Sequence, residues 1–124
     1  MSDEISKLPP NVQERLLRLQ QLQQTLQTIM AQKQQVEMEK NEVEQTLAEL
    51  EKTAVDATIY KAIGSLLVKA DKAKVTEDLT ERKELLGTRS TVIARQEERI
   101  KSQVKEAQTK LQEDLSPVSG QPLS

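Results

Sequence analysis

Acidic side chains are the main candidates for acid–base chemistry in this sequence, because histidine and cysteine are both absent. The possible carboxylate pairs are Glu97 with Glu98 and Asp78 with Glu81. A catalytic carboxylate usually needs burial or a neighbouring charge that tunes its pKa. These pairs lie in strongly charged stretches that are typical of a solvated helix face. The sequence therefore predicts no catalytic residues and a protein that is not an enzyme.

Neither a phosphate-binding loop nor a metal site is indicated. A P-loop needs two closely spaced glycines before a lysine, whereas Gly64, Gly87 and Gly120 lie far apart. A zinc site would have to consist of carboxylates alone, since zinc normally prefers cysteine and histidine ligands. We therefore expect no cofactor and no metal-ligating residue.

The charge balance and hydropathy argue against nucleic acid and membranes as partners. The chain carries 20 acidic and 18 basic residues, a net charge of −2, whereas phosphate binding requires a basic excess. No apolar run approaches the ~20 residues of a membrane span. Residues 1–10 contain two acids and no apolar signal-peptide core. With no cysteine for disulfides, we expect a cytoplasmic protein.

The composition favours long helices over a compact globule. Of 124 residues, 31% are charged and only Tyr60 is aromatic, which is typical of a coiled coil. The four prolines lie near the ends of the chain, at positions 9, 10, 117 and 122. Because proline breaks helices, the long interval between them permits two extended helices.

The first predicted helix, residues 11–54, has apolar residues at alternating steps of three and four. One heptad position holds Val12, Leu19, Leu26, Leu47 and Ala54, and the other holds Leu8, Leu22, Ile29, Val36, Val43 and Leu50. Arg15, Lys33 and Lys40 interrupt this seam. The sustained repeat predicts a coiled coil.

The second predicted helix, residues 76–115, has a more polar seam. One position holds Leu79, Leu86, Ile93, Ile100 and Ala107, and the other holds Thr76, Lys83, Ser90, Glu97, Val104 and Leu111. Thr76, which precedes two acids, resembles a helix start, and Asp71 is an alternative start. Gly87 lowers the helix propensity locally. The polar seam residues fit either register control or a flexible middle of the arm.

The sequence of residues 55–75, between the two predicted helices, predicts a β-hairpin. Two apolar runs flank Gly64-Ser65, a Gly-X pair that suits a type II′ turn. This turn would pair Ile63 with Leu66 and Ile59 with Ala70 on one, mostly apolar, face. The alternative is a helical run broken at Gly64.

A lone hairpin is marginal in water, and its edges invite pairing with another chain. We therefore expect several subunits to combine their hairpins. The predicted fold is mainly α, a long antiparallel coiled-coil hairpin with a central β-hairpin that oligomerises into a common sheet or a β-barrel hub. Residues 1–10 are predicted to be flexible and residues 116–124 to be disordered. The predicted oligomerisation residues are Ile59, Tyr60, Ile63, Leu66, Leu67 and Val68.

The hairpin segment Tyr60-Lys61-Ala62-Ile63-Gly64-Ser65-Leu66-Leu67-Val68-Lys69, followed by Glu81-Arg82-Lys83-Glu84-Leu85-Leu86, resembles the archaeal prefoldin beta subunits. The resemblance extends from Asn11 to Leu115. It implies a heterohexamer of two alpha and four beta subunits, with a β-barrel platform and six coiled-coil arms. In that family the ends of the arms hold unfolded proteins, which pass to a group II chaperonin without nucleotide hydrolysis.

The helix ends carry more apolar residues than the seam requires. These residues either complete the seam and pack on a neighbouring arm, or form an exposed patch that grips unfolded chains. The resemblance favours the second interpretation, an ATP-independent chaperone subunit; the alternative is a structural coiled-coil tether that binds one defined partner. The predicted client-binding residues are Val12, Leu16, Leu17, Leu19, Leu111 and Leu115.

Overall fold

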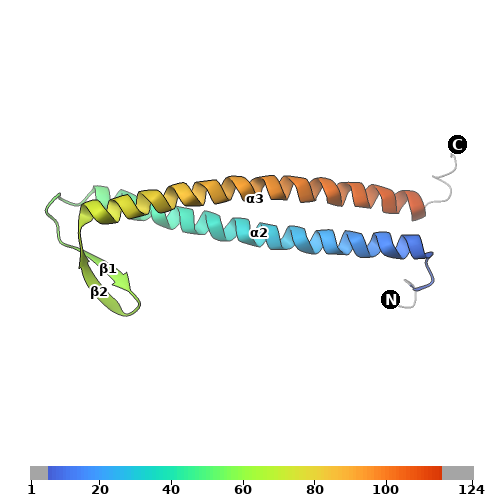
Figure 1. Ribbon diagram of the computed structural model, residues 1–124, viewed down its shortest axis with the longest axis horizontal. Helices are drawn as coiled ribbons and strands as arrows, with labels where there is room; N and C mark the ends of the chain where they lie inside the picture. Colours follow the sequence, from blue (N-terminus) through green and yellow to red (C-terminus); the bar gives the residue numbers. More distant parts are fainter. Residues whose placement is uncertain (1–5, 116–124) are drawn as a thin grey trace. The chain divides into compact units, whose positions relative to one another are not determined.

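The computed structural model describes residues 6–115, which form two long antiparallel helices with a two-stranded hairpin between them (Figure 1). The elements are α2 (Pro10–Glu51), β1 (Ile59–Ile63), β2 (Leu66–Ala70) and α3 (Lys72–Leu115). This architecture confirms the predicted mainly α fold with a central β-hairpin. The predicted disordered tail, and the first five residues of the predicted flexible segment, lie outside the described residues.

Helix α2 begins at a proline and ends near a side chain of α3. Pro10 occupies the first helical position, where its missing N–H costs nothing. Beyond the helix end, the Thr53 hydroxyl donates to the Leu50 carbonyl at 2.6 Å. The Lys72 Nζ atom donates to the Thr53 carbonyl at 2.8 Å. The first bond adds a donor to a carbonyl of the last turn of α2, and the second joins the segment after α2 to the start of α3.

Helix α3 begins at Lys72, four residues before the predicted start at Thr76. Asp71 caps it, because its Oδ2 atom accepts a hydrogen bond from the Lys74 amide at 3.3 Å. Asp71, the alternative start in the sequence analysis, is therefore the N-cap in place of Thr76. The helix continues through Gly87 without a break, so the local loss of propensity is overcome by its surroundings.

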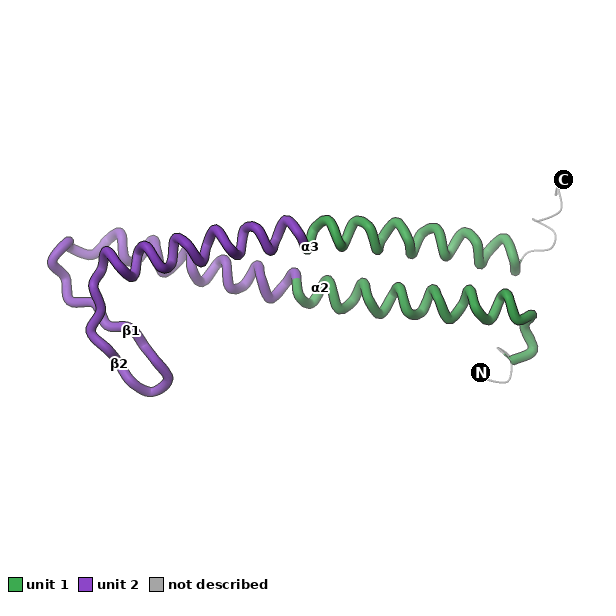
Figure 2. Tube along the Cα trace, viewed as in Figure 1, with its two compact units in different colours: residues 1–32, 93–124 green, residues 33–92 purple. Residues whose placement is uncertain are grey.

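The chain divides into two compact units, one made of the described parts of residues 1–32 and 93–124 and the other of residues 33–92 (Figure 2). Each unit pairs part of α2 with part of α3. In the first unit the buried apolar residues are Val12, Leu19, Leu22, Ile29, Ile93 and Ile100, and in the second they are Val36, Val43, Leu50 and Leu86. All ten belong to the predicted heptad positions. Ala54, which was also assigned to the seam, is exposed because it lies beyond the end of α2.

The hairpin has the predicted register. The Cα partners are Ile59 with Ala70, Tyr60 with Lys69, Lys61 with Val68, Ala62 with Leu67 and Ile63 with Leu66. Gly64 has a φ of 60°, whereas no non-glycine residue among those described has a positive φ. A positive φ at the first turn residue alone is the pattern of a type II′ turn. Glycine at this position therefore sets the turn and, through it, the register.

Within residues 6–115, neither helix combines the length and apolar character that a bilayer crossing requires. The same residues contain no group of three or more acidic side chains arranged to hold a metal ion.

Candidate functional site

Apolar side chains that are exposed or partly exposed gather in two places, and each defines a candidate surface. The hairpin surface consists of Ile59, Tyr60, Ile63, Leu66, Leu67 and Val68. The helix-end surface consists of Leu16, Leu17, Leu111 and Leu115, from the start of α2 and the end of α3. The hairpin surface lies in the second unit and the helix-end surface in the first.

The hairpin surface is open to solvent along both strands. Leu66 and Leu67 are 66% and 71% exposed, and only Ile59 is partly covered. Side chains alternate between the faces of a strand, so Ile59, Ile63, Leu66 and Val68 share one face with Lys61. A contiguous exposed apolar patch of this kind marks an interaction surface.

The helix-end surface is only part of the set that the sequence analysis assigned to client binding. Leu17 and Leu115 are 56% and 50% exposed, and Leu16 and Leu111 are partly buried. Val12, by contrast, is only 2% exposed, and Leu19 is also buried. These two side chains line the helix interface of the first unit, so the exposed apolar area comes from the other four.

A polar cluster joins the two helices beside this surface. The Asp114 Oδ2 atom on α3 accepts hydrogen bonds from Arg15 Nε and, at 3.3 Å, from Asn11 Nδ2, both on α2. The contact with Arg15 is also an ion pair. Sequence analysis placed Arg15 at a seam position but did not find its partner. A charged residue at a seam position indicated that a partner of opposite charge was needed. Which residue is that partner depends on the register of the two helices.

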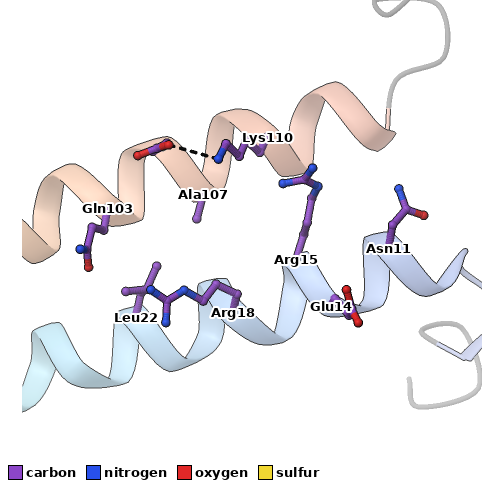
Figure 3. Close-up of a pocket in the computed structure, with 9 residues that line it drawn as sticks. Asn11, Glu14, Arg15, Arg18, Leu22, Gln103, Ala107 and Lys110 are labelled. Atoms are coloured by element: carbon purple, nitrogen blue, oxygen red, sulfur yellow. Dashed lines mark ion pairs between the residues drawn. The ribbon is translucent and has the colours of Figure 1, made fainter.

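Two shallow grooves flank the helix ends in the first unit. One, of about 500 Å³, lies between α2 and α3 and has the basic side chains of Arg15, Arg18 and Lys110 in its lining (Figure 3). The Lys110 Nζ atom pairs with Glu106 Oε1 at 3.2 Å. The apolar residues that line this groove are Leu22 and Ala107, whereas five of its nine lining residues are charged.

The second groove, of about 450 Å³, is lined by Leu16 and Leu17 together with polar side chains of the first turns of α2. Its other lining residues are Pro10, Gln13, Glu14 and Gln20. A lining that combines two leucine side chains with amide and carboxylate groups suits the side chain of an extended polypeptide better than it suits a reaction.

The candidate carboxylates do not form a reaction centre. Asp78 pairs with Lys74 at 3.1 Å, and this hydrogen bond and charge raise the pKa of Lys74 above its usual value. Glu98 and Glu81 are exposed. The solvated-face prediction is wrong for Glu97, which is buried and lies 3.6 Å from Lys101 Nζ. Its heptad position turns it towards α2 rather than towards solvent.

Comparison with known proteins agrees with this geometry. The family model described as "Prefoldin subunit" matches residues 13–117. The chain is 43% identical over 118 residues to the prefoldin subunit beta of Saccharolobus islandicus, covering 93% of this chain and 94% of that protein. It is 44% identical over 116 residues to the prefoldin subunit beta of Archaeoglobus fulgidus, covering 94% and 100%. The fold is similar to the crystal structure of the prefoldin beta subunit from Thermococcus strain KS-1, with a TM-score of 0.79, 38% identity and coverage of 88% and 96%.

Proposed function

This chain belongs to the prefoldin beta-subunit family, a group of non-enzymatic chaperone subunits, and from that premise we propose that it captures unfolded polypeptides and delivers them to a group II chaperonin. The capture requires no nucleotide and no cofactor. The chain works in the cytoplasm as one of four beta subunits that assemble with two alpha subunits. Neither nucleic acid nor a membrane takes part.

Assembly uses the hairpin surface. An isolated two-stranded hairpin is at best marginally stable in water, and this one leaves Tyr60, Ile63, Leu66, Leu67 and Val68 exposed. Pairing with strands of other subunits would satisfy the backbone groups of both edges and cover the apolar face. A closed barrel built from several hairpins has no free edge. The proposed platform is such a barrel.

Client capture uses the helix-end surface. The observation that carries this assignment is the exposure of Leu17 and Leu115, together with a groove that Leu16 and Leu17 line. Flexible leucine side chains adapt to many apolar partners rather than to one. Each end offers a small apolar area and a weak grip. Several arms of one complex acting on the same client raise the overall affinity through effective concentration.

The test is suppression of aggregation by the assembled complex of this chain with an alpha subunit. A chemically denatured, unrelated protein is diluted into buffer, and light scattering is followed with the wild-type complex and with a variant that combines Leu16→Ser, Leu17→Ser and Leu115→Ser. The matched control is Leu85→Ser, because Leu85 is 53% exposed but lies outside both surfaces. We expect the triple variant to lose protection and the control to retain it, with both complexes unchanged in size.

Two results would contradict the assignment. If the wild-type complex leaves scattering unchanged, the chaperone function itself is wrong. If the triple variant protects as well as the control, the client is held elsewhere in the complex.

A further inference from the structure

The β1 edge of the hairpin carries a charge that bears on which chain pairs with it. The described sheet has two strands only, so each strand has one edge without a strand partner in the described chain. Lys61 is the central residue of β1, Ile59–Ile63. It is the one charged residue on the face that it shares with Ile59, Ile63, Leu66 and Val68.

The Lys61 side chain makes no hydrogen bond or ion pair within residues 6–115. The hairpin strands carry two lysines, at positions 61 and 69, and no acid. Lysine on a strand edge is a common means of blocking unwanted pairing between identical chains. The hairpin therefore presents a purely positive charge to any incoming strand.

Pairing of β1 with a second copy of itself would bring like charges together. An interface between two identical chains with two-fold symmetry is self-complementary, so residue i faces residue j and the reverse. In an antiparallel pair that matches all five residues of β1, the central residue faces its own copy. Lys61 of one chain would then lie directly opposite Lys61 of the other. Like charges directly opposite each other destabilise a strand pair.

A shift in register would separate the two Lys61 side chains, but each possible shift weakens the strand pair in another way. A slip by one residue turns the apolar face of one copy to the opposite side of the sheet. A slip by two residues keeps the apolar faces together but leaves part of each strand unpaired. A strand with Asp or Glu opposite Lys61 avoids both losses and gains a cross-strand ion pair.

We propose that the β1 edge is selective: it accepts a strand of a different chain that carries a carboxylate opposite Lys61, and it disfavours the β1 edge of a second copy of this chain. The inference rests on the hairpin-mediated assembly described above. It assigns Lys61 as the residue of the hairpin that separates mixed pairing at this edge from two-fold pairing of β1 with itself.

The experiment uses the full chain alone, so that no alpha subunit is needed. Sedimentation equilibrium measures self-association of the wild type, of Lys61→Glu and of Lys61→Gln, and mixed association of labelled wild type with Lys61→Glu. We expect the mixed pair to associate about three- to tenfold more tightly than the wild type with itself, because a like pair becomes an opposite pair. The difference should shrink in high salt, since the charges are exposed. Lys61→Gln should self-associate more tightly than the wild type.

The matched control is Lys69→Glu, which makes the same charge change on β2 and on the other face. Its mixture with the wild type should associate no more tightly than the wild type alone. Circular dichroism of each variant checks that the helix content is preserved. A mixture of wild type and Lys61→Glu that gains nothing, or a gain that salt leaves intact, would overturn the proposal.

A second arm separates this proposal from the proposed function. An alpha subunit is titrated into wild type and Lys61→Glu, and the charge reversal should weaken that binding severalfold. If the alpha subunit does not bind even the wild type, the hexamer proposal fails, while the comparison made with this chain alone still decides whether Lys61 is selective.

Discussion

Arg15 at the start of α2 and Asp114 at the end of α3 form an ion pair, although 99 positions separate them in the sequence. Both side chains are partly exposed. Asp114 also accepts a hydrogen bond from Asn11, so one carboxylate fixes the first two turns of α2 against α3. The pair explains why a charged residue occupies a seam position. Arg15 interrupts the apolar repeat, but its guanidinium reaches across to a partner.

Removing either partner should loosen this end of the first unit. Asp114→Asn should lower the free energy of unfolding by about 0.5–1 kcal/mol, as expected for a partly exposed ion pair. Thermal unfolding of the assembled complex measures this effect, and a double-mutant cycle with Arg15→Gln isolates the pair. The coupling should decrease in high salt. A cycle with no coupling at low salt would show that the contact contributes nothing to stability.

A carboxylate placed in the apolar face of the hairpin should break assembly. Ile63→Asp or Val68→Asp would leave an unpaired charge in the proposed interface, which is costly. We expect the complex with the alpha subunit to dissociate into smaller species, as seen by size-exclusion chromatography with light scattering, while the helix content stays constant.

Val55→Asp is the matched control for the hairpin variants. Val55 is almost fully exposed in the linker between α2 and β1, so the same change there should leave the complex intact. If Ile63→Asp assembles as well as this control, the hub does not use the hairpin.

Two glycines should respond to alanine in opposite ways. Gly87 lies inside α3, and a Cβ atom built there meets nothing within 4 Å. Gly87→Ala should therefore stabilise the helix by about 0.5–1 kcal/mol, because glycine has more backbone entropy to lose on folding.

Gly64 also has open space around it, but its φ of +60° disfavours any side chain. Gly64→Ala should destabilise the turn by roughly 1 kcal/mol. Thermal unfolding of the complex gives the sign of each change. A stabilising Gly64→Ala would contradict the type II′ turn, and a destabilising Gly87→Ala would reveal a close packing partner at that site in the assembly.

The hairpin could be predicted in detail because the residues that determine it are neighbours in the sequence. Gly64-Ser65 determines the turn, and the turn determines every cross-strand pair. The apolar seam could be predicted because a heptad repeat specifies which residues face inward, as with Leu22 and Ile93. The start of α3 was predicted at Thr76 with Asp71 as the alternative, and the structure has the alternative. Both residues offer a capping oxygen, and the choice between them depends on the path of the chain out of β2.

The contacts between the helices were not accessible from the sequence. The partner of Arg15 depends on how far one helix is shifted along the other. A heptad pattern shows which residues face inward, but it does not fix this shift. The assignment of Val12 and Leu19 to client binding has a different cause. Both already stood at a predicted seam position, and the structure buries them there, whereas Leu17 lies off the seam and is exposed.

Removing the helix ends gives the sharpest test of client capture. A chain trimmed to residues 19–109 keeps the hairpin and the inner heptads, so the complex should still assemble with its full stoichiometry. The trimming removes Val12, Leu16, Leu17, Leu111 and Leu115. Apolar contact contributes roughly 25 cal/mol per Å² of buried surface, and losing it at every arm removes the multivalent gain as well. Aggregation suppression should therefore be abolished rather than reduced.

The buried and exposed members of that set can be separated by a second variant. Val12→Ala leaves Leu17 and Leu115 in place but removes a fully buried side chain, so it should lower stability by about 1–3 kcal/mol with little effect on capture at a temperature where the complex stays folded. Light scattering with the trimmed complex, the Val12→Ala complex and the wild type is compared with a sizing run of each. If the trimmed complex keeps its stoichiometry and protects as well as the wild type, the platform rather than the helix ends must hold the client.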